Sequence, residues 1–260
     1  MAKGIDVSVL TCTGFRPEAF GLCVKWMERQ RLEGLRVQWV IVDDERIQRG
    51  SELGRRVPFD SVMAVPGYDG SCRHTMPINV HNVIGYCEGD VVVFVEDDDW
   101  YHPNYLRTMH SSIFERETAI AGIAGCRYYH VGNPSAKDYR YRNPSYWGRY
   151  STSYSSLCRT AISRRANADR LREICFHCHE VKGDRTDTTV DIQLWGATPA
   201  EEGRLLLDEP GLCISIKGLP GRKVSDSLHS KPFKNPDPTW KTLFDWIGED
   251  ANFYREIMRS

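Results

Sequence analysis

The sequence lacks several features that would assign the protein to a common class at once. No apolar run approaches the roughly 18 residues that a membrane-spanning helix needs. The first residues lack the apolar core of a secretory signal peptide, and neither Gly-x-Gly-x-x-Gly nor Gly-x-x-x-x-Gly-Lys-Ser/Thr occurs. Internal repeats and low-complexity segments are also absent. We therefore expect a cytoplasmic protein with no integral membrane association, and neither a dinucleotide-binding nor a P-loop enzyme.

Cysteine is present, but not in a pattern that indicates disulfides or zinc. The nine cysteines are an odd number and are scattered through the chain. Cys175 and Cys178 form one Cys-x-x-Cys pair with two histidines beside them, but no second pair follows at the spacing of a zinc site. We expect reduced thiols and a structural role for this pair.

Length and patterning favour one large α/β domain. The chain has 260 residues, 41% of them hydrophobic and 27% charged, with a net charge of -1. Strands are expected at residues 5–12, 37–42, 62–65, 91–96, 120–129, 205–207 and 212–216. Helices are expected at residues 17–31, 79–87, 103–114, 168–176, from 189 onward, 240–247 and 252–258, and a long functional loop at 133–154. This alternation predicts a mostly parallel sheet with helices on both faces.

The most informative segment is a strand followed at once by four acidic residues. Residues 91–95 are apolar and mostly β-branched, which is typical of a strand buried on both faces, and residues 96–99 read Glu-Asp-Asp-Asp. Such a cluster needs a compensating positive charge, and hard oxygen ligands suit a divalent cation. Ligands of open α/β sheets bind beyond the carboxyl ends of the strands, so the segment indicates a metal-assisted site for a phosphorylated substrate. The alternative is a solvated turn, with Asp99 capping the helix near Pro103.

A second segment, residues 127–172, is basic and aromatic. It contains ten Lys and Arg against two Asp, together with eight Tyr and Trp residues. The rest of the chain is correspondingly acidic. This composition is typical of a surface that binds phosphates and stacks on rings.

The amino-terminal half resembles a GT-A-fold glycosyltransferase of the family-2 type. The similar stretches are residues 9–13 with Arg16-Pro17, residues 39–44, and residues 88–106, where a Gly-Asp start, an apolar strand, the acidic cluster, an aromatic pair and Pro follow at fixed spacing. The resemblance covers about residues 5–110. It implies a GT-A (Rossmann-like) fold, with a nucleotide-sugar donor half at 1–130 and an acceptor half at 131–260 within one domain.

The resemblance also implies roles for individual residues. The acidic cluster corresponds to the DXD motif, with Asp98 as a ligand of Mn²⁺ or Mg²⁺ and with Glu96 where the family usually has Asp. The donor, for which a UDP-sugar is favoured, would contact residues of the first two strands, the acidic cluster and a late Gly-rich loop. These donor residues are Thr11, Thr13, Arg16, Asp43, Glu96, Asp97, Arg222 and Lys223. His229 corresponds to a late histidine that completes metal coordination in some GT-A enzymes.

Family-2 enzymes that invert the anomeric centre place their general base before a Leu-Trp pair. By this resemblance the base is Asp191, with Asp187 in reserve; the alternative is that Asp191 caps its own helix. The ion would stabilise the charge on the departing nucleoside diphosphate.

The acceptor is expected at the basic, aromatic segment. Its candidate residues are Arg140, Arg142, Tyr146, Trp147 and Arg149. A polyanion would be attracted there, and the loop at 218–223 resembles those of bacteriophage-encoded DNA-modifying glycosyltransferases. The leading hypothesis is therefore transfer to a 5-hydroxymethylpyrimidine such as hydroxymethylcytosine in phage DNA, in the cytoplasm of the host, with the nucleotide flipped out. The alternatives are surface polysaccharide synthesis, a nucleotidyltransferase, and a nucleic-acid-binding module without catalysis.

Overall fold

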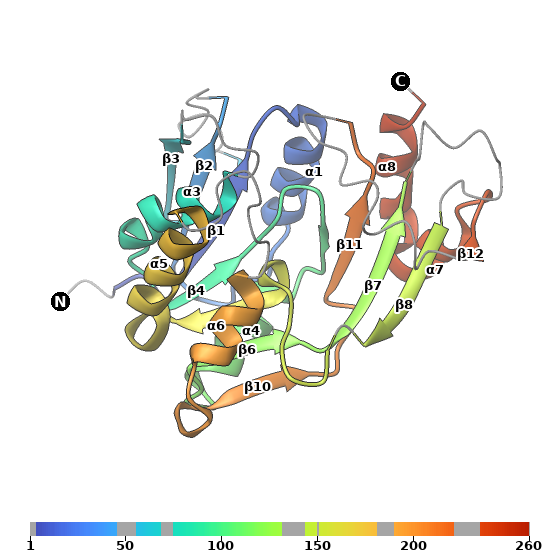
Figure 1. Cartoon of the computed structure of the whole chain (residues 1–260). Helices are drawn as coiled ribbons and strands as arrows, with labels where there is room; N and C mark the ends of the chain where they lie inside the picture. The colour runs from blue at the N-terminus through green and yellow to red at the C-terminus, as the bar shows by residue number, and fades with distance from the viewer. Residues whose placement is uncertain are drawn as a thin grey trace.

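Two β-sheets of different size form the framework of the protein (Figure 1). The structure is a computed structural model that describes residues 4–45, 56–68, 75–131, 144–149, 151–180, 190–220 and 235–259. The strands are β1 Val7–Thr13, β2 Val37–Asp43, β3 Ser61–Pro66, β4 Val91–Phe94, β5 Trp100–Tyr101, β6 Ile120–Ile123, β7 Gly125–His130, β8 Pro144–Arg149, β9 Thr160–Ser163, β10 Arg204–Leu207, β11 Cys213–Lys217 and β12 Asn235–Pro236. The α-helices are α1 Pro17–Glu28, α3 Met76–Val83, α4 Tyr105–Phe114, α5 Arg164–Glu180, α6 Val190–Ala197, α7 Lys241–Ile247 and α8 Ala251–Ile257. The 3₁₀ turns are η1 Ile84–Tyr86, η3 Leu157–Arg159, η5 Ala200–Glu202 and η6 Gly248–Asp250.

The larger sheet confirms the predicted fold class. Its seven strands have the order β10-β6-β9-β4-β1-β2-β3, and β3, β2, β1 and β4 pair in parallel. β9 runs antiparallel to both of its neighbours, β4 and β6. The sheet is therefore mostly parallel, and one end of it collects the carboxyl ends of β1, β2 and β4, where an α/β fold places its ligands.

Apolar side chains cover both faces of the central strands, as the sequence predicts. Val9 and Val93 belong to a core that includes side chains of α1, α4 and α8, whereas Leu10 and Phe94 belong to a second core with α3, α5 and α6. Successive residues of a strand point to opposite faces, so one apolar run supplies both cores. Each fully buried aliphatic side chain contributes about 1.5–3 kcal/mol, and these strands therefore fix the position of whatever follows them.

The chain passes from the seven-stranded sheet to the five-stranded sheet at three places: β4 to β5, β6 to β7 and β10 to β11. The sequence predicts one strand at residues 120–129, and this is wrong because the chain changes sheets at Ala124, whose N–H donates to Leu207 O at 2.8 Å. Gly125 is required there, since a Cβ would lie 2.9 Å from the Pro210 side chain. The acidic residues 96–99 lie in the first of these crossings, between the two sheets.

Three further elements differ from the sequence prediction. The segment 133–154, expected to be a loop, contains β8, which pairs antiparallel with β7. Strand β9 was not predicted, because its four residues carry too short a pattern to be distinguished from the helix that follows. Helix α5 begins four residues before the predicted start and ends four residues after the predicted end.

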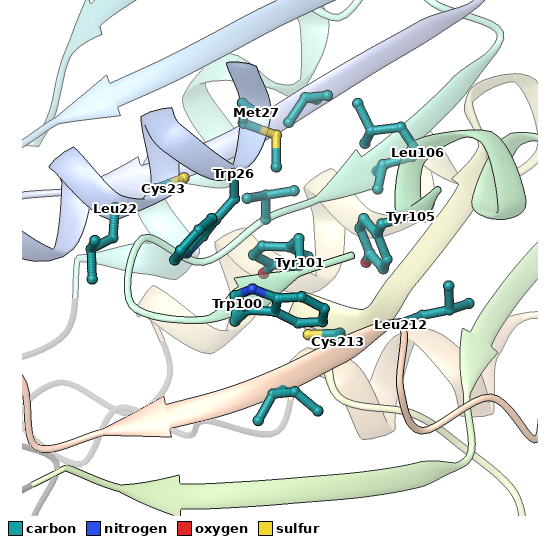
Figure 2. Close-up of a cluster of buried hydrophobic side chains, with 14 of the residues drawn as sticks. Leu22, Cys23, Trp26, Met27, Trp100, Tyr101, Tyr105, Leu106, Leu212 and Cys213 are labelled. Atoms are coloured by element: carbon teal, nitrogen blue, oxygen red, sulfur yellow. The ribbon is translucent and has the colours of Figure 1, made fainter. Parts of the chain in front are cut away.

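The carboxyl-terminal helices pack beside the five-stranded sheet and against α1 (Figure 1). Trp26 of α1 donates its indole N–H to Tyr254 Oη of α8 at 3.0 Å. In Figure 2, Trp100 lies between Trp26 of α1 and Cys213 of β11, and its ring centroid is 6.5 Å from that of Trp26. Trp100 and Tyr101 are buried, so they are core residues.

No helix in the described part of the chain is both long and apolar enough to cross a bilayer.

Candidate active site

Asp97, the second residue of the acidic segment, is fixed to the first strand and the loop after it. Its carboxylate accepts from Thr13 Oγ1 at 2.8 Å and from Arg16 Nη1 at 2.9 Å. Burial raises the pKa of Asp97 to about 7, although Arg16 and Thr13 act in the opposite direction. Thr13 and Arg16, predicted to contact the donor, therefore hold the acidic segment in place.

Asp98 is held by two cations that come from distant parts of the chain. Arg16 Nη2 lies 2.8 Å and Lys217 Nζ 3.4 Å from its carboxylate, and the residue is only 4% exposed. Burial alone would raise the pKa of Asp98, but Lys217 and Arg16 outweigh this effect and lower it to about 2. Arg16 contacts Asp97 and Asp98 with two different nitrogens, so one guanidinium fixes the spacing of both carboxylates.

Asp99 fastens the acidic segment to the five-stranded sheet. It is fully buried and accepts from Ser215 Oγ and from the backbone N–H of Ile216, both at 3.0 Å. Arg159, also fully buried, donates to Ser215 Oγ at 2.6 Å and so holds the hydroxyl that donates to Asp99. Burial raises the pKa of Asp99 to about 7, against the opposing effect of Lys217. The proposed alternative, that Asp99 caps the helix near Pro103, is wrong.

Glu96 leaves the acidic segment open on one side. Its side chain is 49% exposed, and its carboxylate lies 3.3 Å from Lys217 Nζ, which also lies 3.4 Å from Asp98 and Asp99. Three carboxylates therefore enclose a single cationic atom, and carboxylate oxygens are also the ligands that Mn²⁺ and Mg²⁺ prefer. Among the described residues, the side chains with ligand atoms within 4.8 Å of one another are Glu96, Asp99 and Cys158. Cys158 places its sulfur near Glu96 and Asp99, but burial raises the pKa of its thiol well above the usual range, which disfavours the thiolate that a metal needs.

Asp43 lies beside this segment, at the end of β2. It is 9% exposed and accepts from the Glu45 N–H at 2.9 Å. The next residue, Asp44, accepts from Asn79 Nδ2 at 2.8 Å and from Thr75 Oγ1 at 2.5 Å, which ties the end of β2 to helix α3. Because β1 and β2 pair in register up to Thr13 and Asp43, these two predicted donor residues lie side by side at the carboxyl ends of their strands.

Thr11 differs from the prediction. It is fully buried, and its hydroxyl accepts from the Trp39 indole N–H at 3.0 Å. Its side chain therefore supports the packing of β1 against β2 and has no surface for a ligand.

Asp191, the predicted base, lies in the first turn of α6 and is 7% exposed. Its carboxylate accepts from the adjacent Ile192 N–H at 2.8 Å, as expected of an acid that also caps its helix. Leu194 and Trp195 anchor α6 in the second core, where the Trp195 indole donates to Thr160 Oγ1 at 3.2 Å. The Leu-Trp pair of the motif thus fixes the helix that carries Asp191.

Several predicted site residues lie outside the described part of the chain: Asp187, Arg222, Lys223, His229, Arg140 and Arg142. Tyr146, Trp147 and Arg149 lie on strand β8, opposite Tyr128, Arg127 and Gly125 of β7.

The basic, aromatic segment is partly core. Arg159, Tyr128 and Tyr129 are buried, so its composition overstates the charge and aromatic surface that it presents. Arg164, Arg165 and Arg172 of α5 are exposed.

Sequence reasoning missed Lys217, Ser215 and Arg159, which complete the acidic site. Lys217 is separated from Glu96 by 121 positions in the sequence, and it is the last residue of a strand in the other sheet. The available signal in the sequence was a lysine placed directly after the apolar strand predicted at residues 212–216, which itself follows a Pro-Gly turn.

No protein-family model matches the chain, and no curated protein sequence matches it. Solved structures do match. Residues 1–349 of S. aureus TarS align with a TM-score of 0.57 and 12% identity over 82% of this chain, and the same TarS fragment in complex with UDP-GlcNAc aligns with a TM-score of 0.54 and 13% identity over 86%. The chain spans about 60% of the TarS fragment. At this identity the likeness concerns the fold, and the chain therefore has the α/β fold of the GT-A glycosyltransferases.

Proposed function

We propose that the protein is a glycosyltransferase that moves a sugar from a nucleotide-sugar donor to a hydroxyl group. One observation carries this proposal: on a GT-A fold, the carboxylates of Glu96, Asp98 and Asp99 surround one cationic position just after β4. A diphosphate donor needs positive charge at that edge of the sheet, and a cation held there meets the need. The likeness to a structure that contains UDP-GlcNAc supports a UDP-sugar as donor.

Asp98 and Glu96 would hold a divalent ion, which supplies Lewis-acid stabilisation of phosphate oxygens when bound. The other residues have separate tasks. Arg16 keeps Asp97 and Asp98 at fixed spacing, and Asp99 ties the segment to β11. Asp43 and the end of β1 border the space where the nucleoside would lie.

Asp191 would act on the acceptor. In transfer with inversion, its carboxylate takes the proton of the acceptor hydroxyl while the oxygen forms a bond to the anomeric carbon. The bond from that carbon to the diphosphate breaks, and the electron pair leaves with the nucleoside diphosphate. Leu194 and Trp195, buried in the core, keep the carboxylate from drifting as the proton moves.

For the acceptor we propose a 5-hydroxymethylpyrimidine in DNA, attracted by the basic segment of residues 127–172. The exposed arginines of α5 and the arginines at 140, 142 and 149 support this choice, because phosphate contacts dominate the affinity for nucleic acid. A base hydroxyl inside a duplex is reached when the nucleotide is flipped out.

The direct experiment is a mass-spectrometric screen of nucleotide sugars against DNA that contains hydroxymethylcytosine, with unmodified DNA as the control. A mass increase of one sugar on the modified DNA alone would support both donor class and acceptor. Transfer to a polysaccharide primer instead would support the proposed glycosyltransferase activity but contradict DNA as the acceptor. No transfer, together with DNA binding that no nucleotide sugar affects, would favour a binding module.

Charge reversal tests the acceptor separately. Arg140→Glu with Arg142→Glu should weaken DNA binding and reduce its dependence on salt, since two phosphate contacts are lost. Arg107→Glu with Arg116→Glu changes the same number of charges at exposed positions in and after α4 and is the matched control. Equal DNA binding by both double variants would contradict the assigned surface.

A further inference from the structure

The ammonium of Lys217 lies among three carboxylates of the acidic segment, the kind of oxygen ligands that a divalent ion would use. Its Nζ atom lies 3.3 Å from Glu96 and 3.4 Å from both Asp98 and Asp99, and its side chain is 10% exposed. Two like charges cannot share the centre of one group of carboxylates without strong repulsion. A divalent ion that uses Glu96 and Asp98 must therefore move the ammonium away.

The contacts of Lys217 are looser than those of Arg16. Charge-assisted N–H···O bonds are typically about 2.7–2.9 Å long. Arg16 meets this range, at 2.8 and 2.9 Å, whereas Lys217 lies beyond it at all three carboxylates. The lysine side chain is also flexible and carries a single point charge, while the guanidinium is held as a planar fork. Of the two cations that contact residues 96–99 within the described part of the chain, Lys217 is the one suited to exchange.

The acidic segment has a fixed side and an open side. Asp99 is fully buried and held by Ser215 and Ile216, so it cannot follow the ammonium. The side chain of Glu96 is half exposed, so the acidic segment meets solvent at this residue. An ion can therefore enter beside Glu96, and the ammonium can leave by the same side toward an anionic ligand.

We propose that Lys217 is a resident counter-ion that a divalent cation displaces, and that the displaced ammonium binds the diphosphate of the donor. The proposal rests on the proposed function and deepens it. It makes metal binding and diphosphate binding cooperative through one residue: the metal releases the ammonium, and the phosphates give it a new partner. Without a diphosphate, the metal must compete with Lys217 and binds weakly.

Lys217→Met provides the main test, because methionine keeps most of the length and removes the charge. Calorimetric titration should show Mn²⁺ binding to the variant at least tenfold more tightly than to the wild-type protein in the absence of nucleotide. Saturating UDP should tighten Mn²⁺ binding at least tenfold in the wild-type protein and less than threefold in the variant. Lys241→Met, which removes an exposed lysine paired with Asp245 on α7, should behave like the wild-type protein.

A second measurement uses the unaltered protein and does not depend on the folding of a variant. Acetylation of Lys217 by a small reagent, followed by mass spectrometry, should become at least threefold faster when Mn²⁺ is added. Further addition of UDP should protect Lys217 again. Lys241 should react at one rate in all three conditions.

The outcomes separate this inference from the proposed function. Equal Mn²⁺ affinity and equal coupling to UDP in Lys217→Met and wild-type protein, with no change in acetylation of Lys217, would overturn the displacement and leave the metal role intact. Binding of UDP without any binding of Mn²⁺ in both proteins would overturn the metal role, and the displacement with it.

Discussion

Asp250 and the acidic residues 96–99 both join distant parts of the chain, but they balance charge differently. Asp250, at the end of η6, accepts two hydrogen bonds from Arg29, the residue after α1, and one from the Trp100 indole at 2.8 Å. One carboxylate therefore meets one guanidinium and one neutral donor. In the acidic segment, four carboxylates meet Arg16 and Lys217, and Arg159 stands behind Ser215.

The two sites differ in how completely their negative charge is balanced. In the Arg29–Asp250 pair, one positive charge balances one negative charge. The guanidinium also lies over the Trp26 ring at 4.3 Å, so the pair fastens the end of α1 to the carboxyl-terminal helices. Residues 96–99 retain negative charge in excess of the cations that touch them in the described chain. A surplus of carboxylate oxygen suits a divalent cation, and in the proposed function that cation, not the carboxylates, binds the diphosphate.

The largest expected effect is on turnover. Asp98→Asn should reduce sugar transfer by at least about 100-fold, because the substitution removes a charged ligand at the position where negative charge develops. Asp250→Asn should keep kcat within about threefold of the wild-type value, since its role is to fasten helices. Initial rates at saturating donor measure both, and an active Asp98→Asn enzyme would contradict the distinction.

Substitution of Asp191 should lower the rate of catalysis without changing the binding of the donor. Asp191→Asn removes the proton acceptor, and kcat should fall about 100-fold while the KM for the donor stays within about twofold. Asp169→Asn, an exposed aspartate of α5, is the matched control. Normal turnover by Asp191→Asn would contradict its role as the base and favour the alternative that Asp191 caps its helix.

Substitution of Asp250 should lower the free energy of unfolding. Asp250→Asn leaves Arg29 and the Trp100 indole with a weaker partner, and we expect a loss of about 1–3 kcal/mol in the free energy of unfolding. Asp245→Asn breaks an exposed pair with Lys241 and should cost about 0.5 kcal/mol or less. Urea denaturation of both variants measures the difference, and equal losses would remove the distinction.

A further expected effect concerns stability in acid. Because the pKa of Asp98 is lowered from 3.8 to about 2 in the folded protein, its carboxylate stabilises the fold above pH 3.8 and loses this effect as the pH falls toward 2. A shift of this size corresponds to about 2 kcal/mol. The difference in unfolding free energy between wild-type protein and Asp98→Asn should therefore shrink by about that amount between pH 5 and pH 2. A difference that stays constant would show that the carboxylate is not held ionised.

What the sequence could predict was local. The strand at residues 91–94 and the acids after it follow from a continuous pattern, and the parallel sheet follows from the alternation of such patterns. The function of each acid was not predictable in this way. Asp97, Asp98 and Asp99 are adjacent in sequence, yet their partners come from the loop before α1 and from β11.

Contacts between distant segments account for what sequence reasoning missed. The need for positive charge at residues 96–99 was predicted, but its source, Lys217, depends on how β11 pairs with β5 and β7 in the second sheet. The change of sheet at Ala124 depends likewise on Leu207 and Pro210. A period of two along one strand carries no information on which sheet that strand joins.

In the proposed function, the acidic segment at residues 96–99 holds a cation that binds the diphosphate of a donor. The most direct measurement is a calorimetric titration of UDP into the wild-type protein and into Asp98→Asn, each in Mn²⁺ and in EDTA. We expect Mn²⁺ to tighten UDP binding at least tenfold in the wild-type protein and to leave it unchanged in the variant. Equal UDP affinity in Mn²⁺ and EDTA for the wild-type protein would contradict it.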